Sequence, residues 1–540
     1  MISASAMLVV ALAAAEAAPP PPPVGVTRQE SPGAARFEAV LPGRLLSYAL
    51  PKGLSGRREI LLLVGPEPEE VPAPEKNEAQ PSPPEPCDKA TQPEHETLLP
   101  RLLLRLDLTD EGGTLATLRG DLPPDSAFVD AIDLEGDGIE EIVLGRPGEL
   151  LVLRDSSGRR AAGGPDLLMK DPYILPGTER LLEPWIIRYP AIAGVSILPL
   201  DILGGVRFYG PRDQGRSWDL LQEAALPMEA QLKEGSLRVE SPRVRVAGRR
   251  PDGRILFASG PEAYGKQRLR SLLIDPMASG EARRVECWSL LPGLEEVIEA
   301  QYLLLEGRPA LLVTTRSARK LSLFGEKMLR LFRLDESDRS RTGGTPLLAV
   351  DSHMNLWQSM RPVARDVDGD GREDLVIGYW KGLKDSRVVL DAYMRKEDGS
   401  FDRSPVTTDF DVERGDRSIL DYRGDLDGDG RADLLLAASG AAQVFAGSPV
   451  SREGKGLVER KARWSIPLSA NAGARGRGSG GGTDFQISIG GKGSGFSSWS
   501  DGDGSPRPVD LDGDGRAEIL IAAAQVRGRG LLQVIRLTTR

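Results

Sequence analysis

The chain has few of the side chains that most catalytic and zinc sites use. Its 540 residues include two histidines, His95 and His353, and two cysteines, Cys87 and Cys287. A Ser-His-Asp or Cys-His catalytic group and a zinc site of clustered His and Cys are therefore poorly supported. Two cysteines also cannot build a disulfide-rich scaffold, and we favour no bridge between them.

The chain also lacks an excess of basic residues and any long apolar run. Its formal net charge is −10, which argues against nucleic acid as a partner, because such binding needs a basic face. The apolar run from Met7 to Ala15 is too short for a transmembrane helix of ~20 residues but suits a secretory signal. We expect a signal peptide over residues 1–17, a Pro-rich linker over 18–35, and export to the periplasm, the cell surface or the medium.

Glycine is abundant, with 62 residues, whereas aromatic residues make up 5%. This composition suits many short strands joined by turns better than a helix bundle. It predicts an all-β chain.

Four segments share one pattern, an Asp/Gly loop followed by an apolar, strand-like run. They are IDLEGDGIEEIVLG from Ile132, RDVDGDGREDLVIG from Arg365, GDLDGDGRADLLLA from Gly424 and VDLDGDGRAEILIA from Val509. Two neighbouring loops are 59 residues apart, and the next interval approaches that length once the Gly-rich stretch 471–495 is set aside. The interval between the first and second loops is close to four such units. Weaker copies without the acids begin at Gly56, Ser196, Gly253 and Gly307.

Repeats of this length, each with several short apolar runs, are typical of β-propeller blades. We predict a propeller of about eight four-stranded blades over residues 36–540, with seven as the alternative because the unit near Ser196 is faint. The segments 65–96 and 471–495 are predicted to be disordered inserts. The strand RFEAVLP from Arg36 is expected to pair with the last strand, because closing a ring protects the strand edges.

Each loop places acids at its first, third, fifth and ninth positions. Glycine at the sixth position permits a tight curl, and the seventh residue offers its backbone carbonyl. Such a loop supplies most of the six to eight oxygens that calcium takes. The candidate ligands are Asp133, Glu135, Asp137, Ile139 and Glu141; Asp366, Asp368, Asp370, Arg372 and Asp374; Asp425, Asp427, Asp429, Arg431 and Asp433; and Asp510, Asp512, Asp514, Arg516 and Glu518.

An EF-hand shares the opening of these loops but needs Glu at the twelfth position and flanking helices. The twelfth residues here are Leu144, Ile377, Leu436 and Ile521, within β-branched or otherwise apolar runs. The EF-hand is therefore rejected, and these four side chains are predicted to pack into the blades.

The loops resemble the FG-GAP/VCBS repeats of integrin α-subunit heads and of many exported bacterial proteins. The resemblance is strong over about half of the chain and rests on the repeat length alone elsewhere. It implies a β-propeller with about four calcium ions in loops between adjacent strands, and extracellular partner binding without catalysis. The middle units depart from the family because they lack the acids.

We therefore expect a binding or scaffold module for a protein or polysaccharide, and not an enzyme. Two alternatives stay open: a carbohydrate-active enzyme, either a lyase or a glycosidase with paired carboxylates, and a lectin. No aromatic residue recurs in the repeats, which disfavours the lectin. The sequence does not identify the ligand or the oligomeric state.

Overall fold

The computed structural model describes the chain apart from a set of excluded segments, and its described residues form strands, turns and loops without a helix. The segments outside the description are 1–24, 32, 52–57, 67–99, 133–139, 154–164, 171–185, 190–193, 198–204, 213–216, 226–228, 234–235, 241–243, 250–254, 265–267, 275–283, 292–294, 318–326, 335–344, 353–361, 382–386, 412–418, 439–440, 451–455, 469–505, 527–528 and 539–540. The described part of the chain offers no apolar helix of the length that a bilayer crossing requires.

Most strands belong to antiparallel sheets whose members follow one another along the chain. Six sheets have four strands each. They are β3–β6 (Arg44–Ala49, Arg58–Gly65, Arg101–Leu108, Gly113–Leu122), β7–β10 (Phe128–Ile132, Glu141–Arg146, Glu149–Leu153, Asp166–Lys170), β17–β20 (Val244–Arg249, Ile255–Tyr264, Arg268–Ile274, Arg284–Leu290), β21–β24 (Glu295–Leu305, Arg308–Ser317, Lys327–Arg333, Leu348–Ser352), β25–β28 (Val363–Arg365, Asp374–Lys381, Arg387–Tyr393, Val406–Asp411) and β29–β32 (Ile419–Asp421, Leu434–Ala438, Ala441–Phe445, Trp464–Pro467).

A five-stranded sheet joins the two ends of the described chain. Its order is β1 (Gly25–Ser31), β2 (Ala34–Val40), β35 (Arg529–Leu537), β34 (Glu518–Val526) and β33 (Arg507–Val509). The predicted pairing of the N-terminal strand with the last strand is confirmed, since Arg36 faces Ile535 and Val40 faces Leu531. The strand β1 lies within residues 18–35, the segment predicted as a linker. β1 has few apolar residues because it is largely exposed, so its sequence does not read as a strand.

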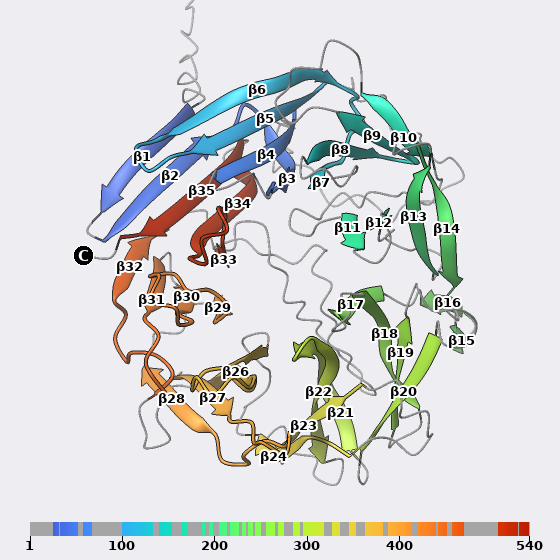
Figure 1. Ribbon diagram of the computed structural model, residues 1–540, viewed down its shortest axis with the longest axis vertical. Coiled ribbons are helices and arrows are strands. Elements are labelled where there is room, and N and C mark those ends of the chain that lie inside the picture. The colour runs from blue at the N-terminus through green and yellow to red at the C-terminus, as the bar shows by residue number, and fades with distance from the viewer. Residues whose placement is uncertain are drawn as a thin grey trace, which may run out of the picture.

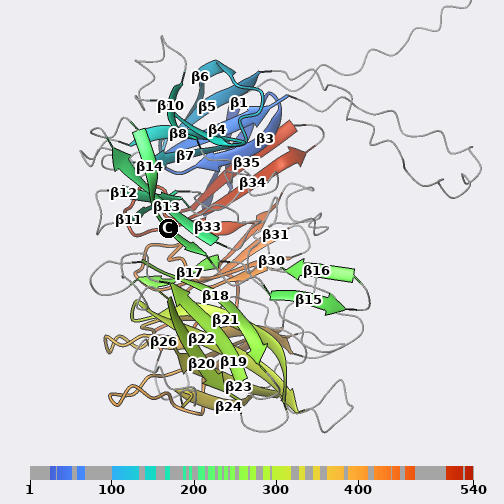
Figure 2. The same cartoon turned by 90° about the vertical axis from the view of Figure 1, so that its right-hand side faces the viewer.

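The sheets are arranged around a common centre, as in a β-propeller (Figure 1). First strands such as β29 and β33 lie nearer the centre, and fourth strands such as β28 and β32 lie at the rim. Three hairpins occupy the arc between β10 and β17: β11–β12 (Ile186–Tyr189, Gly194–Ile197), β13–β14 (Gly205–Arg212, Ser217–Ala225) and β15–β16 (Glu229–Lys233, Ser236–Glu240). In the side view, β15–β16 stands away from the ring (Figure 2). The number of blades, eight or seven, stays a prediction.

The hydrophobic core consists of layers between neighbouring sheets. One layer packs β2, β34 and β35 against β3–β5, and includes Phe37, Leu45, Leu62 and Leu532. Corresponding layers lie between the β29–β32 and β33–β35 strands, between β25–β28 and β29–β32, and between β21–β24 and β25–β28. The sheets thus stabilise one another face to face, and the loops that join their strands are left at the ends of the layers.

The weaker sequence copies fall on strands. The copy from Gly56 contains β4, those from Gly253 and Gly307 cover most of β18 and β22, and the copy from Ser196 begins in β12 and ends in β13. The predicted signal peptide, Cys87 and nearly all of the two predicted inserts lie outside the described residues. Cys287 is buried on β20.

Lys327 is a charged side chain buried within a strand. Lys327 begins β23 with 5% of its surface exposed, and it faces Arg316 across the strand pair. Burial lowers the pKa of Lys327 to about 8, and the like charge of Arg316 adds to this shift.

Replacing this lysine should therefore change the stability of the protein in a pH-dependent way. Because the folded-state pKa lies below that of the unfolded chain, the cost of burying the charge is complete below pH 8 and declines as pH rises towards about 10.5. We compare the free energies of unfolding of Lys327→Met and of the native chain. The value for the variant relative to the native chain should be about 2 kcal/mol lower at pH 10 than at pH 7. Denaturant titration at both pH values measures this difference, and an equal difference at both would contradict it.

Candidate metal sites in three aspartate loops

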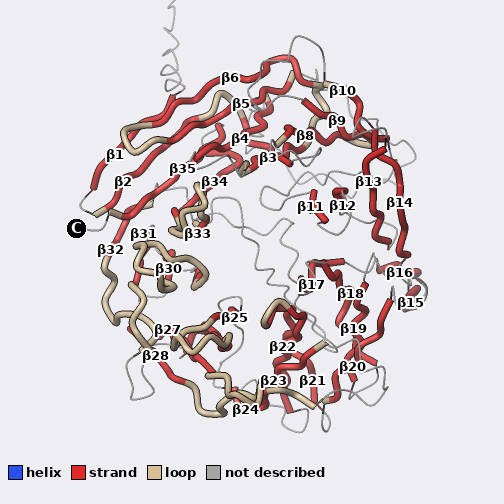
Figure 3. The backbone as a smooth tube through the Cα atoms, in the orientation of Figure 1, coloured by secondary structure: helices blue, strands red, loops and turns tan. Residues whose placement is uncertain are grey.

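Three of the four aspartate loops are described. They span residues 366–374, 425–433 and 510–518, and are called loops 2, 3 and 4 by their order in the sequence. Loops 2 and 3 connect the first and second strands of their sheets, and loop 4 connects β33 and β34 of the five-stranded sheet. In loops 2 and 4 the pairs Arg365–Asp374 and Val509–Glu518 close the hairpin. Figure 3 shows these connections next to β25, β30 and β33. Their placement agrees with the expectation of loops between adjacent strands of one blade.

The residue at the twelfth position anchors each loop in the core. Leu144, Ile377, Leu436 and Ile521 are all buried on the second strand of their sheets. The prediction that these side chains pack into the sheets is confirmed. It also explains why none of the four positions carries the Glu that an EF-hand needs.

Glycine at two positions gives the loops their curl. The sixth residues Gly371, Gly430 and Gly515 have φ between +83° and +87°. The fourth residues Gly369, Gly428 and Gly513 have positive φ as well. Residues with a Cβ rarely adopt this backbone conformation, so both glycines are needed for the shape of the loop.

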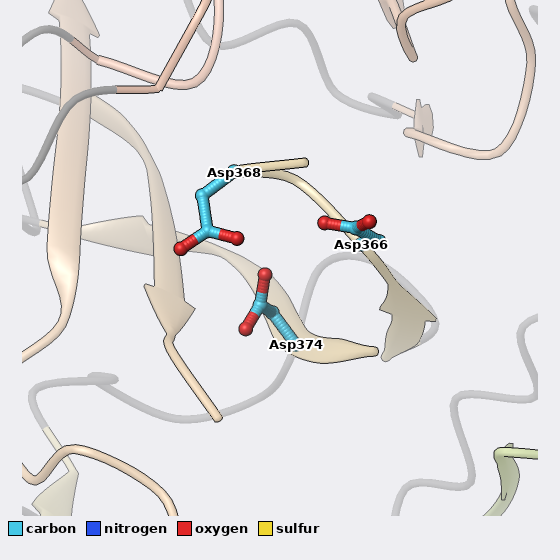
Figure 4. Close-up of side chains that lie close together, drawn as sticks. All are labelled: Asp366, Asp368 and Asp374. Carbon is cyan, nitrogen blue, oxygen red and sulfur yellow. The ribbon is translucent and has the colours of Figure 1, made fainter. Parts of the chain in front are cut away.

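Loop 2 brings carboxylate oxygens of Asp366, Asp368 and Asp374 within 4.8 Å of one another (Figure 4). Asp366 accepts hydrogen bonds from the amides of Gly369 and Gly371 at 2.7 and 2.8 Å. Asp374 is fully buried and accepts from the amides of Val367 and Arg395, at 3.1 and 2.7 Å. Two oxygens that bind the same calcium ion lie at most about 5 Å apart, so this spacing fits the ion.

Loop 3 repeats this geometry with more burial. Asp425, Asp427 and Asp433 are all buried, and their oxygens lie within 4.8 Å of one another. Asp433 accepts hydrogen bonds from the amides of Leu426, Asp427 and Gly447 at 2.7 to 3.0 Å. The Gly447 contact ties the loop to the end of β31, as the Arg395 contact ties loop 2 to the end of β27.

Loop 4 differs at its ninth position. Its close carboxylates are Asp510, Asp512 and Asp514, and Glu518 does not belong to the group. Glu518 is buried, and its Oε1 lies 3.2 Å from Nε of Arg58 on β4. The same Nε donates a hydrogen bond to Asp512 at 2.9 Å.

Not every predicted ligand joins a group. Asp370 and Asp429, at the fifth positions of loops 2 and 3, instead form ion pairs with Arg372 and Arg431. The seventh-position carbonyls of Arg372, Arg431 and Arg516 stay predictions. In the first loop, Asp133, Glu135, Asp137 and Ile139 lie outside the described residues, and Glu141 is buried at the start of β8.

Burial changes the acidity of the ninth carboxylates. It raises the pKa of Asp374 and of Asp433 to about 6, although backbone amides that donate to both groups act in the opposite direction. Burial also raises the pKa of Asp427, and the nearby Asp429 carboxylate adds to the shift. The anionic form is costly here because water is excluded and other carboxylates are close. A bound divalent cation would offset this cost.

Neighbouring loops also contact each other. The amide of Ala517 in loop 4 donates a hydrogen bond to the carbonyl of Asp425 at 2.7 Å. Nε of Arg516 donates to the carbonyl of Leu426 at 3.2 Å. Loops 3 and 4 therefore support each other across the boundary between two sheets.

Sequence reasoning missed the basic residues that reach these loops from elsewhere. Arg463 lies 36 positions after its partner Asp427, and Arg58 lies 454 positions before Asp512. No local pattern marks either arginine, because the contacts exist only after the sheets have packed.

The comparisons with known proteins do not assign the chain. No family model and no curated protein matches it, so the resemblance to FG-GAP/VCBS repeats stays a prediction. Among solved structures, a periplasmic gluconolactonase from Pseudomonas aeruginosa is 14% identical, covers 68% of this chain and 92% of its own, and has a TM-score of 0.27. A mutant apocarotenoid oxygenase from Synechocystis is 10% identical. The match covers 92% of this chain and 88% of the oxygenase, with a TM-score of 0.29. Neither likeness is close enough to inform fold or activity.

Without metal, the protein should become more stable on mild acidification. The folded-state pKa of about 6 for Asp374 and Asp433 exceeds that of the unfolded chain. Their protonation therefore stabilises the folded state fully below about pH 4, and this stabilisation is lost as pH rises through 6. Each group should add about 1 kcal/mol to the free energy of unfolding at pH 5 relative to pH 7.5. Denaturant titration in chelator should show this gain.

The double variant Asp374→Asn/Asp433→Asn provides the control. It should lose the share of the gain that comes from Asp374 and Asp433, because asparagine does not titrate. The share from Glu518, whose pKa burial raises to about 7, should remain. A native chain whose stability in chelator is the same at pH 5 and pH 7.5 would contradict the assigned acidity.

Proposed function

We propose that this chain is an exported, calcium-stabilised β-propeller that acts as a binding or scaffold module for a protein or polysaccharide partner. The observation that carries the proposal is the convergence of three carboxylates in loop 2 and again in loop 3, each with a buried ninth aspartate. Two loops 59 residues apart in the sequence reach the same geometry, which supports a common ligand.

The chemistry of the donors favours calcium over other metals. The groups contain only carboxylate oxygens, and backbone amides hold several of them in place. Calcium accepts six to eight oxygens in flexible geometry, whereas magnesium demands a near-ideal octahedron and zinc prefers nitrogen and sulfur. The predicted seventh-position carbonyl and water would complete the coordination.

An ion in these loops would have a structural role. Asp374 would link it to the amide of Arg395, just after β27, and Asp433 would link it to Gly447, just after β31. Each ion would therefore join the first hairpin of a sheet to the end of its third strand. A rigid sheet end presents the exposed parts of its loops in a fixed geometry, which limits the entropy cost of binding a partner.

Catalysis has weaker support in the described residues. The three clusters of close carboxylates found among these residues all lie in the aspartate loops, where the proposal assigns them to metal binding or ion pairs. Another buried acid, Asp391, accepts hydrogen bonds from the hydroxyls of Tyr379 and Thr407 at 2.8 and 2.6 Å, a satisfied structural network. Release of products from a panel of polysaccharides would instead favour the carbohydrate-active enzyme.

Calcium should stabilise the folded protein, and chelator should remove the effect. At a free concentration of 100 times the dissociation constant, one site adds about 2.7 kcal/mol to the free energy of unfolding. Asp366→Asn and Asp425→Asn should each remove one bound ion and part of this gain. Thermal unfolding with and without calcium, together with the metal content of the purified protein, measures both.

Asp398→Asn is the matched control, because Asp398 is an exposed aspartate in a turn outside the loops that accepts hydrogen bonds from Ser400. It should leave the ion count and the calcium effect unchanged. Purified protein that contains no calcium and whose unfolding temperature does not respond to added calcium would refute the proposal.

A further inference from the structure

Loop 4 carries the same acids as its neighbours but lies against a buried cation of the chain itself. Arg58 has 8% of its side chain exposed, although arginine is rarely buried without a partner. Its Nε lies 2.9 Å from Asp512 and 3.2 Å from Glu518, whose side chains are 8% and 1% exposed. The third and ninth carboxylates of the loop, which calcium would need, therefore share a guanidinium.

A second arginine strengthens this arrangement. Arg536 on β35 lies 3.4 Å from Asp514 and 4.0 Å from Glu518. Asp110, in the β5–β6 turn, pairs with both guanidiniums, at 2.9 Å from Arg58 and 3.0 Å from Arg536. The acids of loop 4 thus belong to a network of fixed charges that spans the boundary between two sheets.

Loops 2 and 3 differ from loop 4 in the surroundings of the ninth carboxylate. Asp374, Asp433 and Glu518 all accept hydrogen bonds from backbone amides, and Glu518 in addition lies 3.2 Å from the buried Arg58. The hydrogen bonds from the amides leave the remaining lone pairs of Asp374 and Asp433 available to a metal. Arg463 does reach Asp427 in loop 3, but its side chain is 44% exposed and also pairs with Glu459. It can swing into solvent when an ion binds, whereas Arg58 is enclosed.

We propose that loop 4 uses Arg58 as its counter-ion and does not bind calcium, although its sequence matches the calcium loops. The buried ion pair joins β4 to the β33–β34 hairpin, and so fastens the sheet that contains both ends of the described chain to the sheet β3–β6. Calcium at loop 4 would place a divalent cation beside a buried guanidinium. The inference rests on the proposed function only for loops 2 and 3.

Three matched variants test it in one assay. The first-position residues Asp366, Asp425 and Asp510 all accept hydrogen bonds from the glycine amides three and five residues later. Their replacement by Asn therefore has a similar local cost. In equilibrium dialysis with elemental analysis, Asp366→Asn and Asp425→Asn should each lose one calcium ion per chain, and Asp510→Asn should lose none.

Removal of the arginine should uncover the metal site. Arg58→Gln should bind one more calcium ion than the native chain, and the double variant Arg58→Gln/Asp510→Asn should not. Arg105→Gln, which removes an arginine paired with Asp107 on the neighbouring strand β5, should bind the native number.

The outcomes separate the two proposals. Loss of one ion in Asp510→Asn would overturn the assignment of Arg58, and this test does not require the Arg58 variant to fold. A folded Arg58→Gln protein that gains no ion would overturn it as well. If no variant or native protein binds calcium at all, the proposed function itself fails.

Discussion

Repulsion among crowded carboxylates is the constraint on which the rest of this structure depends. Each described loop places at least four acids within nine residues, at the end of a sheet that excludes water from the ninth side chain. Backbone amides turned inward by positive-φ glycines offset part of the repulsion, and they do so in the same way in all three loops. The remainder calls for a positive charge, and the loops differ in where that charge can come from.

The position of the loops gives this electrostatic balance consequences for the fold. Each loop joins two neighbouring strands of a sheet, and in loops 2 and 3 the ninth aspartate also reaches the end of the third strand. Contacts between loops 3 and 4 continue the support to the next sheet. Apolar layers hold the faces of the sheets together, while charged and polar contacts hold their ends. A change in the cations bound to the loops would therefore alter the contacts that hold the ends of the sheets together.

The twelfth residue of each loop is a feature that local sequence alone predicts. An apolar residue there excludes an EF-hand and, because strands alternate and the run is apolar, predicts burial at each of the four positions, as the structure confirms. The strands of the acid-free copies could likewise be placed from their Gly-turn-strand pattern. By contrast, the sequence of β1 does not predict a strand, because a strand held mainly by backbone hydrogen bonds to β2 needs no apolar side chains.

The sequence by itself determined the all-β character, the loops, their glycines and the carboxylates at alternate positions, because each depends on residues within about one hairpin. It could not determine which carboxylates converge, since Asp370 and Asp429 form pairs with arginines while Asp374 and Asp433 face inward. Nor could it show that Arg58 lies against Asp512 and Glu518. Packing between the first and last sheets alone brings these distant residues together. The tertiary structure therefore decided which positive charge each acidic loop meets.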